Sequence, residues 1–101
     1  MSEPDTIYLS HELGTDLSSR ARAASIRVRV LKSIDSGQTI ITIDLSGIRS
    51  LSESFADELF AVLAKTKGDA WFREHLRLNN ASNDVRYSIL EAIDSRVGHG
   101  V

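Results

Sequence analysis

The feature that most constrains the fold is an apolar, β-prone run that leads directly into a helix, over residues 40–63. The run from Thr39 to Leu45 contains three isoleucines, and a short polar loop with Gly47 follows it. From Ser52 onward the apolar residues have helical spacing, and the first turn is rich in serine and acidic residues. A strand that runs into a helix N-terminus is where α/β proteins place their functional loops. We therefore expect the fold and any binding site to be organised around this segment.

The alternation of strands and helices continues on both sides of this segment. β-prone residues predict strands from Thr6 to Leu9 and from Leu76 to Asn79. The nearly continuous β-branched character of the central strand predicts that this strand is covered on both faces. The element order β-α-β-α-β-α predicts a small α/β domain with a mostly parallel sheet and right-handed crossovers.

Start and stop signals delimit the helices in the second half of the chain. The helix that begins near Ser52 is expected to end at Gly68, after two lysines. Asp69 to His75 is expected to form a short helical turn whose aromatic side chains fill the core. A last helix is expected after a capping residue among Ser82, Asn83 and Asp84. The expected buried positions are Phe55, Ala56, Leu59, Val62 and Leu63 in the first helix, Trp71 and Phe72 in the turn, and Val85, Ile89, Ala92 and Ile93 in the last helix.

The segment from Leu17 to Ile34 fits two interpretations. Apolar residues at steps of three and four, together with an alanine-rich front half, favour a helix. The alternation of apolar residues with arginines over residues 26–30 favours a strand, which would make residues 26–43 a hairpin. We predict the helix, with Gly37 just past its end, because its stripe spans the whole segment. The stripe consists of Leu17, Ala21, Ala24, Val28 and Leu31. The same helix carries arginines at 20, 22, 27 and 29. We interpret these arginines as a solvated face rather than as an anion-binding or partner-binding surface.

Composition narrows the class of protein. A length of 101 residues fits one domain over residues 1–101, with a core at about 6–95 and flexible tails at 1–5 and 97–101. The net charge of −2 provides no general attraction to nucleic acid or to anionic membranes. There is no cysteine, and the three histidines lie far apart, so we expect no metal and no cofactor. With no leader-like N-terminus and no apolar run long enough for a membrane span, we expect a cytoplasmic protein.

The chain lacks the common enzyme signatures. It contains neither of the two glycine-rich phosphate loops and no G-x-S-x-G nucleophile elbow. Asp44 ends the central strand, a position where catalytic acids occur. A lone acid there more often organises the following loop by accepting backbone hydrogen bonds. We therefore expect the protein not to be an enzyme.

The serines at the helix start have two interpretations. Ser50 and Glu53 have the spacing of a capping box, and Ser54 and Asp57 repeat that spacing one turn later. In this interpretation, the hydroxyls and carboxylates satisfy the free amides of the helix start and complement its dipole. In the other, one serine is phosphorylated, because a phosphate at a helix N-terminus is stabilised by the free N–H groups. The residues alone leave both open.

The run ITIDLSGIRSLSESFADELF, followed by LRLNNASNDVRYSIL, resembles the bacterial STAS-like domain family of unknown function. The matching residues are Asp44, Gly47 and the string from Ser54 to Phe60, within a similarity that covers about residues 6–95. That family is similar to STAS anti-sigma-factor antagonists, in which a serine at this helix start is phosphorylated by a partner kinase with a histidine-kinase-like ATPase fold. The resemblance implies Ser54 as the phospho-acceptor and Ser52 as the second candidate. The chain departs from the antagonist pattern where Ser52 replaces an aspartate and Phe55 replaces a glycine.

These observations together predict a non-catalytic, protein-binding module of bacterial signalling whose contact surface covers residues 46–57. The candidate contact residues are Asp44, Ser46, Gly47, Arg49, Glu53, Phe55, Asp57, Asn79 and Asn80. The alternative is a small-ligand or nucleotide sensor that uses the same loop as an anion pocket, lined by Ser46, Ser52, Ser54, Asn79 and Asn80. A homodimer is a third hypothesis, because Ile26, Val30 and Ile34 lie off the main stripe of the predicted helix and would form a second apolar surface.

Overall fold

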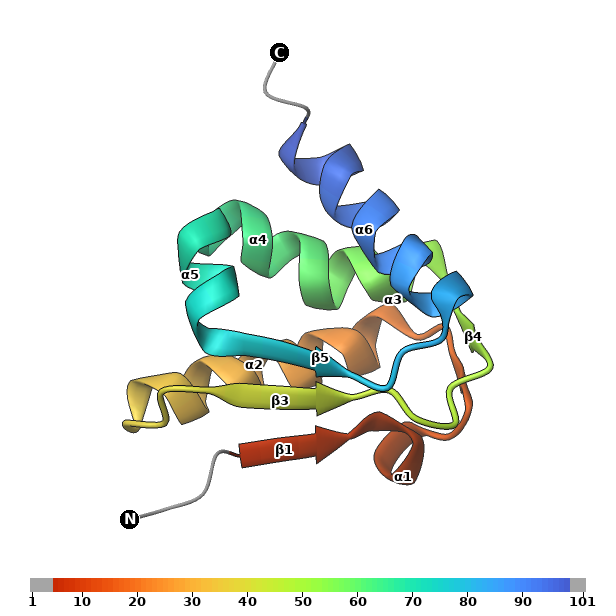
Figure 1. Cartoon of the computed structure of the whole chain (residues 1–101), viewed down its shortest axis with the longest axis horizontal. Coiled ribbons are helices and arrows are strands. Elements are labelled where there is room, and N and C mark those ends of the chain that lie inside the picture. Colours follow the sequence, from red (N-terminus) through yellow and green to blue (C-terminus); the bar gives the residue numbers. More distant parts are fainter. Residues whose placement is uncertain (1–4, 99–101) are drawn as a thin grey trace.

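A computed structural model describes residues 5–98 of the protein. A sheet of three parallel strands forms the centre of the fold (Figure 1). β1 (Asp5–Tyr8) and β5 (Leu76–Asn79) lie on either side of β3 (Ile41–Asp44), and Ile43 is in register with Ile7 and Leu78. Two short strands, β2 (Asp16–Leu17) and β4 (Ser50–Leu51), form a second parallel pair. The predicted α/β domain with a mostly parallel sheet is therefore confirmed.

Helices fill the connections between these strands. A short helix, α1 (Leu9–Leu13), follows β1 directly, so Leu9, the last residue of the predicted strand, belongs to this helix instead. The other helices are α2 (Arg20–Asp35), the run α3 (Glu53–Ala56), η1 (Asp57–Ala61) and α4 (Val62–Lys67), then α5 (Asp69–His75) and α6 (Asn83–Val97). Gly68, with φ of 95°, separates α4 from α5 at the predicted stop. The carboxyl ends of β1 and β3 point to the same edge of the sheet, where α1 and the loop after β3 meet (Figure 1).

The sheet has one apolar face and one polar face. Ile7, Ile41 and Ile43 are buried in the same core cluster as residues of α2, η1 and α6. On the opposite face, Thr6, Thr42 and Arg77 share a register row, and all three are at least partly exposed. The prediction that the central strand is covered on both faces is therefore wrong. The β-branched character of Thr42 reflects strand propensity rather than burial.

The ambiguous segment is a helix, but it turns a different face toward the core. The buried residues of α2 are Ala23, Ile26 and Val30, whereas Val28 is 45% exposed. Leu17 belongs to β2 rather than to the helix. The predicted stripe is therefore confirmed only in part: Leu31 packs against the core, but Ala21 and Val28 are exposed. The side of the helix with Ala23, Ile26 and Val30 is the one that is buried in the core. Of the residues on which the homodimer hypothesis depended, Ile26 and Val30 are buried inside the domain, and Ile34 is partly buried against the same core.

The helical run from residue 53 to residue 67 contains one wide turn. η1 has π-helical hydrogen bonding, and its residues Leu59, Phe60 and Ala61 are all buried between α2 and α6. Most of the predicted stripe is confirmed, but Val62 is only partly buried and Phe60 was missed. In α5, Trp71 and Phe72 pack against the edge of the core while remaining partly exposed. The wide turn explains the miss, because an extra residue in one turn brings neighbouring positions to the same side.

The first strand and the last helix each extend one residue into the predicted tails. Asp5 belongs to β1, where it is in register with Ile41, and Val97 is the last residue of α6. The rest of the predicted tails, residues 1–4 and 99–101, lies outside the described residues. Ser82 caps α6 by accepting a hydrogen bond of 3.2 Å from the backbone N–H of Val85.

Candidate functional site

Asp44 organises the end of the central strand. One of its oxygens accepts hydrogen bonds from the Ser46 backbone N–H at 2.9 Å and the Ser46 hydroxyl at 2.6 Å. The other accepts a hydrogen bond from the Asn80 side-chain amide at 2.9 Å. These bonds, first that of the Ser46 hydroxyl, lower the pKa of Asp44 below its ordinary value. Asp44 therefore joins the loop after β3 to the turn after β5, and it plays the loop-organising role that we expected.

The turn after β5 has an unusual backbone conformation. Asn80 has φ of 62°, a left-handed conformation that asparagine tolerates better than most residues. Asn79 accepts a hydrogen bond of 2.8 Å from the Leu45 backbone N–H through its own carbonyl. The predicted site residues Asp44, Ser46, Asn79 and Asn80 are thus brought together. The polar groups of Ser46 and Asn80 are used inside this network.

The next part of the loop is bonded to the segment around β2. The backbone N–H groups of Arg49 and Ser50 donate to the Thr15 carbonyl at 2.8 and 3.3 Å. Asp16 accepts hydrogen bonds from the Ser50 hydroxyl at 2.8 Å and from the Arg49 guanidinium at 3.2 Å. Both partners lower the pKa of Asp16, and the Ser50 hydroxyl contributes most. The sequence analysis missed Asp16 because a two-residue strand is too short to show a periodic pattern.

The start of α3 is capped by Ser52 alone. Its hydroxyl accepts a hydrogen bond of 3.1 Å from the Phe55 backbone N–H and lies 3.4 Å from the Ser18 carbonyl, to which it donates. The predicted capping box of Ser50 and Glu53 is wrong, because Ser50 is in β4 and bonds to Asp16. Phe55 is only 1% exposed, so this predicted contact residue belongs to the core.

Asp57 and Glu58 point toward arginines of other helices. Asp57 receives two hydrogen bonds of 2.7 Å from Arg96 and one of 3.0 Å from Arg20. Arg96 first, and then Arg20, lower the Asp57 pKa to about 2. Glu58 pairs with Arg27 and Arg20, and the hydrogen bond from Arg27 is the largest cause of its lowered pKa. These pairs connect η1 to α2 and α6, so the predicted contact residue Asp57 has a structural role.

Arg20, Arg22 and Arg29 of α2 are exposed, as the predicted solvated face requires, but most of the α2 arginines also bind carboxylates of other helices. Arg20 and Arg27 pair with carboxylates of η1, and Arg29 pairs with Glu12 of α1. Arg20 and Arg96 are the residues that sequence reasoning missed as partners of Asp57. Their separations of 37 and 39 residues leave no local signal in the sequence.

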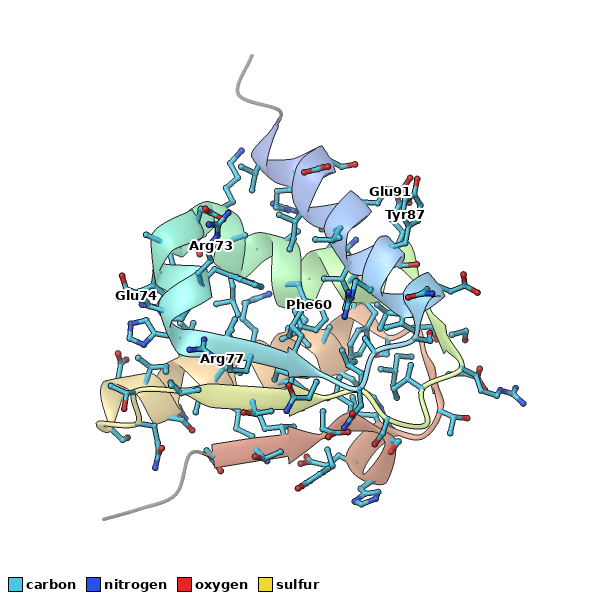
Figure 2. All side chains as sticks on the ribbon, viewed as in Figure 1. Phe60, Arg73, Glu74, Arg77, Tyr87 and Glu91 are labelled. Carbon is cyan, nitrogen blue, oxygen red and sulfur yellow. The ribbon has the colours of Figure 1, made fainter. Side chains whose placement is uncertain are left out.

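The remaining predicted site residues lie at the outer surface. Glu53 is exposed, and partly buried Ser54 lines a shallow hollow with Arg20, Asp57, Ala92 and Ser95. Two further hollows border α6: one lies between Ser50 and Asp84, and the other between Glu53 and Glu91. Ser46 and Ser52 use their hydroxyls in separate networks, so these serines do not converge on one anion pocket. Side chains project from α6 and from the loop beside it (Figure 2).

The described residues hold no recognisable metal centre. Within residues 5–98, no three histidine, aspartate or glutamate side chains come together in a way that could bind a metal ion. Over the same range, no helix combines the length and the hydrophobicity needed to cross a membrane.

The parallel sheet and the capped helix after its central strand define a small α/β domain built around a strand–loop–helix site. Comparison with protein-family models gives its family. The model for the STAS-like domain of unknown function (DUF4325) matches residues 22–86, well over half of the chain. The chain therefore belongs to this family. The matched region starts within α2 and ends in the first turn of α6, so β1, α1 and β2 lie outside it. No curated protein and no solved structure matches the chain.

Proposed function

We propose that this STAS-like domain is a non-catalytic regulatory module that binds a protein partner through its loop surface. We define the loop surface as residues 46–54, which run from the end of β3 to the start of α3. The observation that carries the proposal is that hydrogen bonds to Asp44 and to the Thr15 carbonyl fix the backbone of this loop, while the side chains of Ser46, Arg49 and Glu53 are exposed to solvent. A preorganised loop loses little conformational entropy when a partner binds it. Loops positioned by a rigid scaffold are also where α/β domains carry function.

The bonds of the loop favour protein binding over a small-ligand sensor. Asp44, Ser46 and Asn80 satisfy one another, and the Ser52 hydroxyl is used for the cap. A sensor pocket needs several polar groups that converge on a ligand. Here the side chains of Ser46, Ser52 and Asn80 form hydrogen bonds within the fold, so what the loop offers a partner is its outer surface.

The capture of partners by loop variants tests this proposal. The full chain is immobilised, and partners are captured from extracts of its native host with wild type, with Arg49→Glu/Glu53→Lys, and with Arg73→Glu/Glu74→Lys. Both double variants keep the net charge, and all four side chains are exposed. We expect a protein that wild type and the α5 control capture equally, and that the loop variant captures about tenfold less. A loop variant that captures the same proteins as wild type would refute the loop surface as the contact site.

We further propose that phosphorylation of Ser54 regulates this surface. Two observations support the proposal: the family resemblance, and the position of Ser54 beside the cap rather than in it. A phosphate would add roughly two negative charges next to Glu53 and Asp57, and it would compete with Asp57 for Arg20. This would change the charge that the loop surface presents to its partner. The proposed kinase has a histidine-kinase-like ATPase fold, like the kinases that phosphorylate the antagonists to which the family is similar.

Mass mapping of the protein from its native host tests the phosphorylation. We expect a phosphate on Ser54, and we expect Ser54→Ala, but not Ser50→Ala, to abolish it. An unmodified protein in every growth state would reject the switch. A phosphate on Ser52 instead would move the switch to the capping hydroxyl, where it would remove the hydrogen bond to the Phe55 N–H.

A further inference from the structure

The outer face of α6 carries large apolar side chains that no residue among 5–98 covers. Tyr87 is 65% exposed, Leu90 54% and Val97 50%. These residues are three and seven positions apart, so they lie along one side of the helix, opposite the buried side with Val85, Ile89 and Ala92. In Figure 2, Tyr87 and Glu91 project together from α6, away from the sheet. We call this surface, formed by Tyr87, Leu90 and Val97, the α6 outer face.

Carboxylates that form no ion pair among residues 5–98 lie next to this face. Asp84, Glu91 and Asp94 lie on the exposed side of α6, and Glu53 faces Glu91 across a hollow. None of these four takes part in an ion pair within residues 5–98, whereas Glu12, Asp16, Asp57, Glu58 and Asp69 all do. Arg96 is engaged by Asp57, which leaves Arg86 as the exposed cation along α6 within the described part of the chain. The α6 outer face is therefore apolar at its centre, with an excess of carboxylates around it and with Arg86 four residues before Leu90 on the same side.

This charge selects one kind of occupant. A second copy of the chain, placed face to face, would bring like charges together, which costs free energy in a symmetric interface. Anionic lipids and nucleic acid would be repelled for the same reason. A segment with apolar side chains on one side and lysine or arginine at its edges matches both the apolar centre and the acidic surround.

We infer that the α6 outer face binds a basic amphipathic helix of the protein partner. Apolar side chains of that helix pack on Tyr87 and Leu90, and its cations face Glu91 and Asp94. The hollows between α6 and residues 49–53 make this face continuous with the loop surface. The inference rests on the proposed function, because it presupposes a protein partner, and it adds the chemistry of that partner.

A titration with model peptides tests the inference. The probes are an amphipathic helical peptide of leucine and lysine, and the same peptide with glutamate in place of lysine. The full chain, labelled with ¹⁵N, is titrated with each peptide at low salt. We expect the lysine peptide to shift the amides of residues 84–97, and the glutamate peptide to leave them unchanged. We expect binding to weaken about tenfold as the Debye length falls from roughly 14 Å near 0.05 M salt to about 4 Å near 0.5 M.

Variants with matched controls separate a specific surface from general stickiness. Tyr87→Ala/Leu90→Ala and Glu91→Lys/Asp94→Lys are each expected to weaken binding of the lysine peptide about tenfold. Val28→Ala, which truncates an apolar residue that is 45% exposed, and Glu74→Lys, which reverses an exposed carboxylate, are expected to stay within about twofold of wild type. All these residues are exposed, and thermal melting of each variant checks that it is folded.

Three results would overturn the inference. They are no binding of the lysine peptide at millimolar concentration, equal binding of the glutamate peptide, or amide shifts that do not include residues 84–97. Each would leave the capture experiment with Arg49→Glu/Glu53→Lys unaffected, so failure of this inference is distinct from failure of the proposed function.

Discussion

Replacing Asp57 by asparagine removes the charge that joins η1 to α2 and α6. The lowering of the Asp57 pKa from 3.8 to about 2, a fall of roughly 1.8 pH units, corresponds to about 2.5 kcal/mol at 1.36 kcal/mol per unit. The side chains of Arg20 and Arg96 are 49% and 40% exposed, so solvent screens the interaction. After this screening we expect Asp57→Asn to lower the free energy of unfolding by about 1 kcal/mol at pH 7.

The pH dependence of this loss identifies its cause. The folded state favours ionised Asp57, so the stabilisation is complete above the unfolded pKa of 3.8 and is lost as the pH falls through about 2. The difference between wild type and Asp57→Asn should therefore shrink by about half or more between pH 7 and pH 3. Urea denaturation followed by circular dichroism at both pH values measures it. A difference of 1 kcal/mol should also appear as a fall in Tm of about 4–8 °C at pH 7.

Glu53→Gln provides the matched control for this experiment. Glu53 lies in the same helical run, is exposed and pairs with no arginine among residues 5–98, so its neutralisation should change stability by less than about 0.5 kcal/mol. The reasoning is refuted if Asp57→Asn is as stable as wild type at pH 7, or if its loss of stability is the same at pH 3.

Four further substitutions test the site and the core. Ser52→Ala should cost about 1 kcal/mol and Ser54→Ala less than about 0.5 kcal/mol in urea denaturation, because only Ser52 caps α3; equal costs would contradict the assigned cap. Asp44→Ala should cost about 1–3 kcal/mol, because it leaves the partners of a nearly buried carboxylate unsatisfied. It should also speed amide hydrogen exchange in residues 46–52. Unchanged exchange there would show that the hydrogen bonds to the segment around β2 order the loop without Asp44. Phe60→Ala should cost about 3–5 kcal/mol because Phe60 is fully buried; a loss below about 1 kcal/mol in urea denaturation would mean that η1 repacks.

The parts of the fold that could be predicted depend on local signals. β5 has the bounds that its β-prone residues indicated, and Ser82 caps α6 as one of the three expected residues. Gly37, with φ of 112°, follows the end of α2. Capping, positive φ and strand propensity act over a few residues, so the sequence shows them directly. The role of Asp44 in its loop was predictable for the same reason.

The parts that could not be predicted depend on contacts between distant residues. The inner face of α2 is decided by its packing on η1 and by the pairing of Arg20 with Asp57, which is 37 residues away. Phe55 was expected both as a buried position and as a contact residue, and its exposed fraction of 1% confirms the burial and not the contact. Two-residue strands such as β2 are too short for periodicity, which is why the second support of the loop went unrecognised.

The wide turn of η1 has a consequence for length variation within the family. Deleting one residue from an ordinary helix turns everything after it by about 100°, which would move the apolar residues of that helix away from the core. The π-turn of η1 contains one residue more than an α-helical turn. Deleting that residue would restore regular α-helical spacing, and α3 and α4 would keep the same sides toward the core. Residues 57–61 are thus a place where relatives can differ in length by one residue without a change in fold. For a relative that is one residue shorter in this region, we expect the missing residue to fall within the turn that carries Asp57 and Glu58.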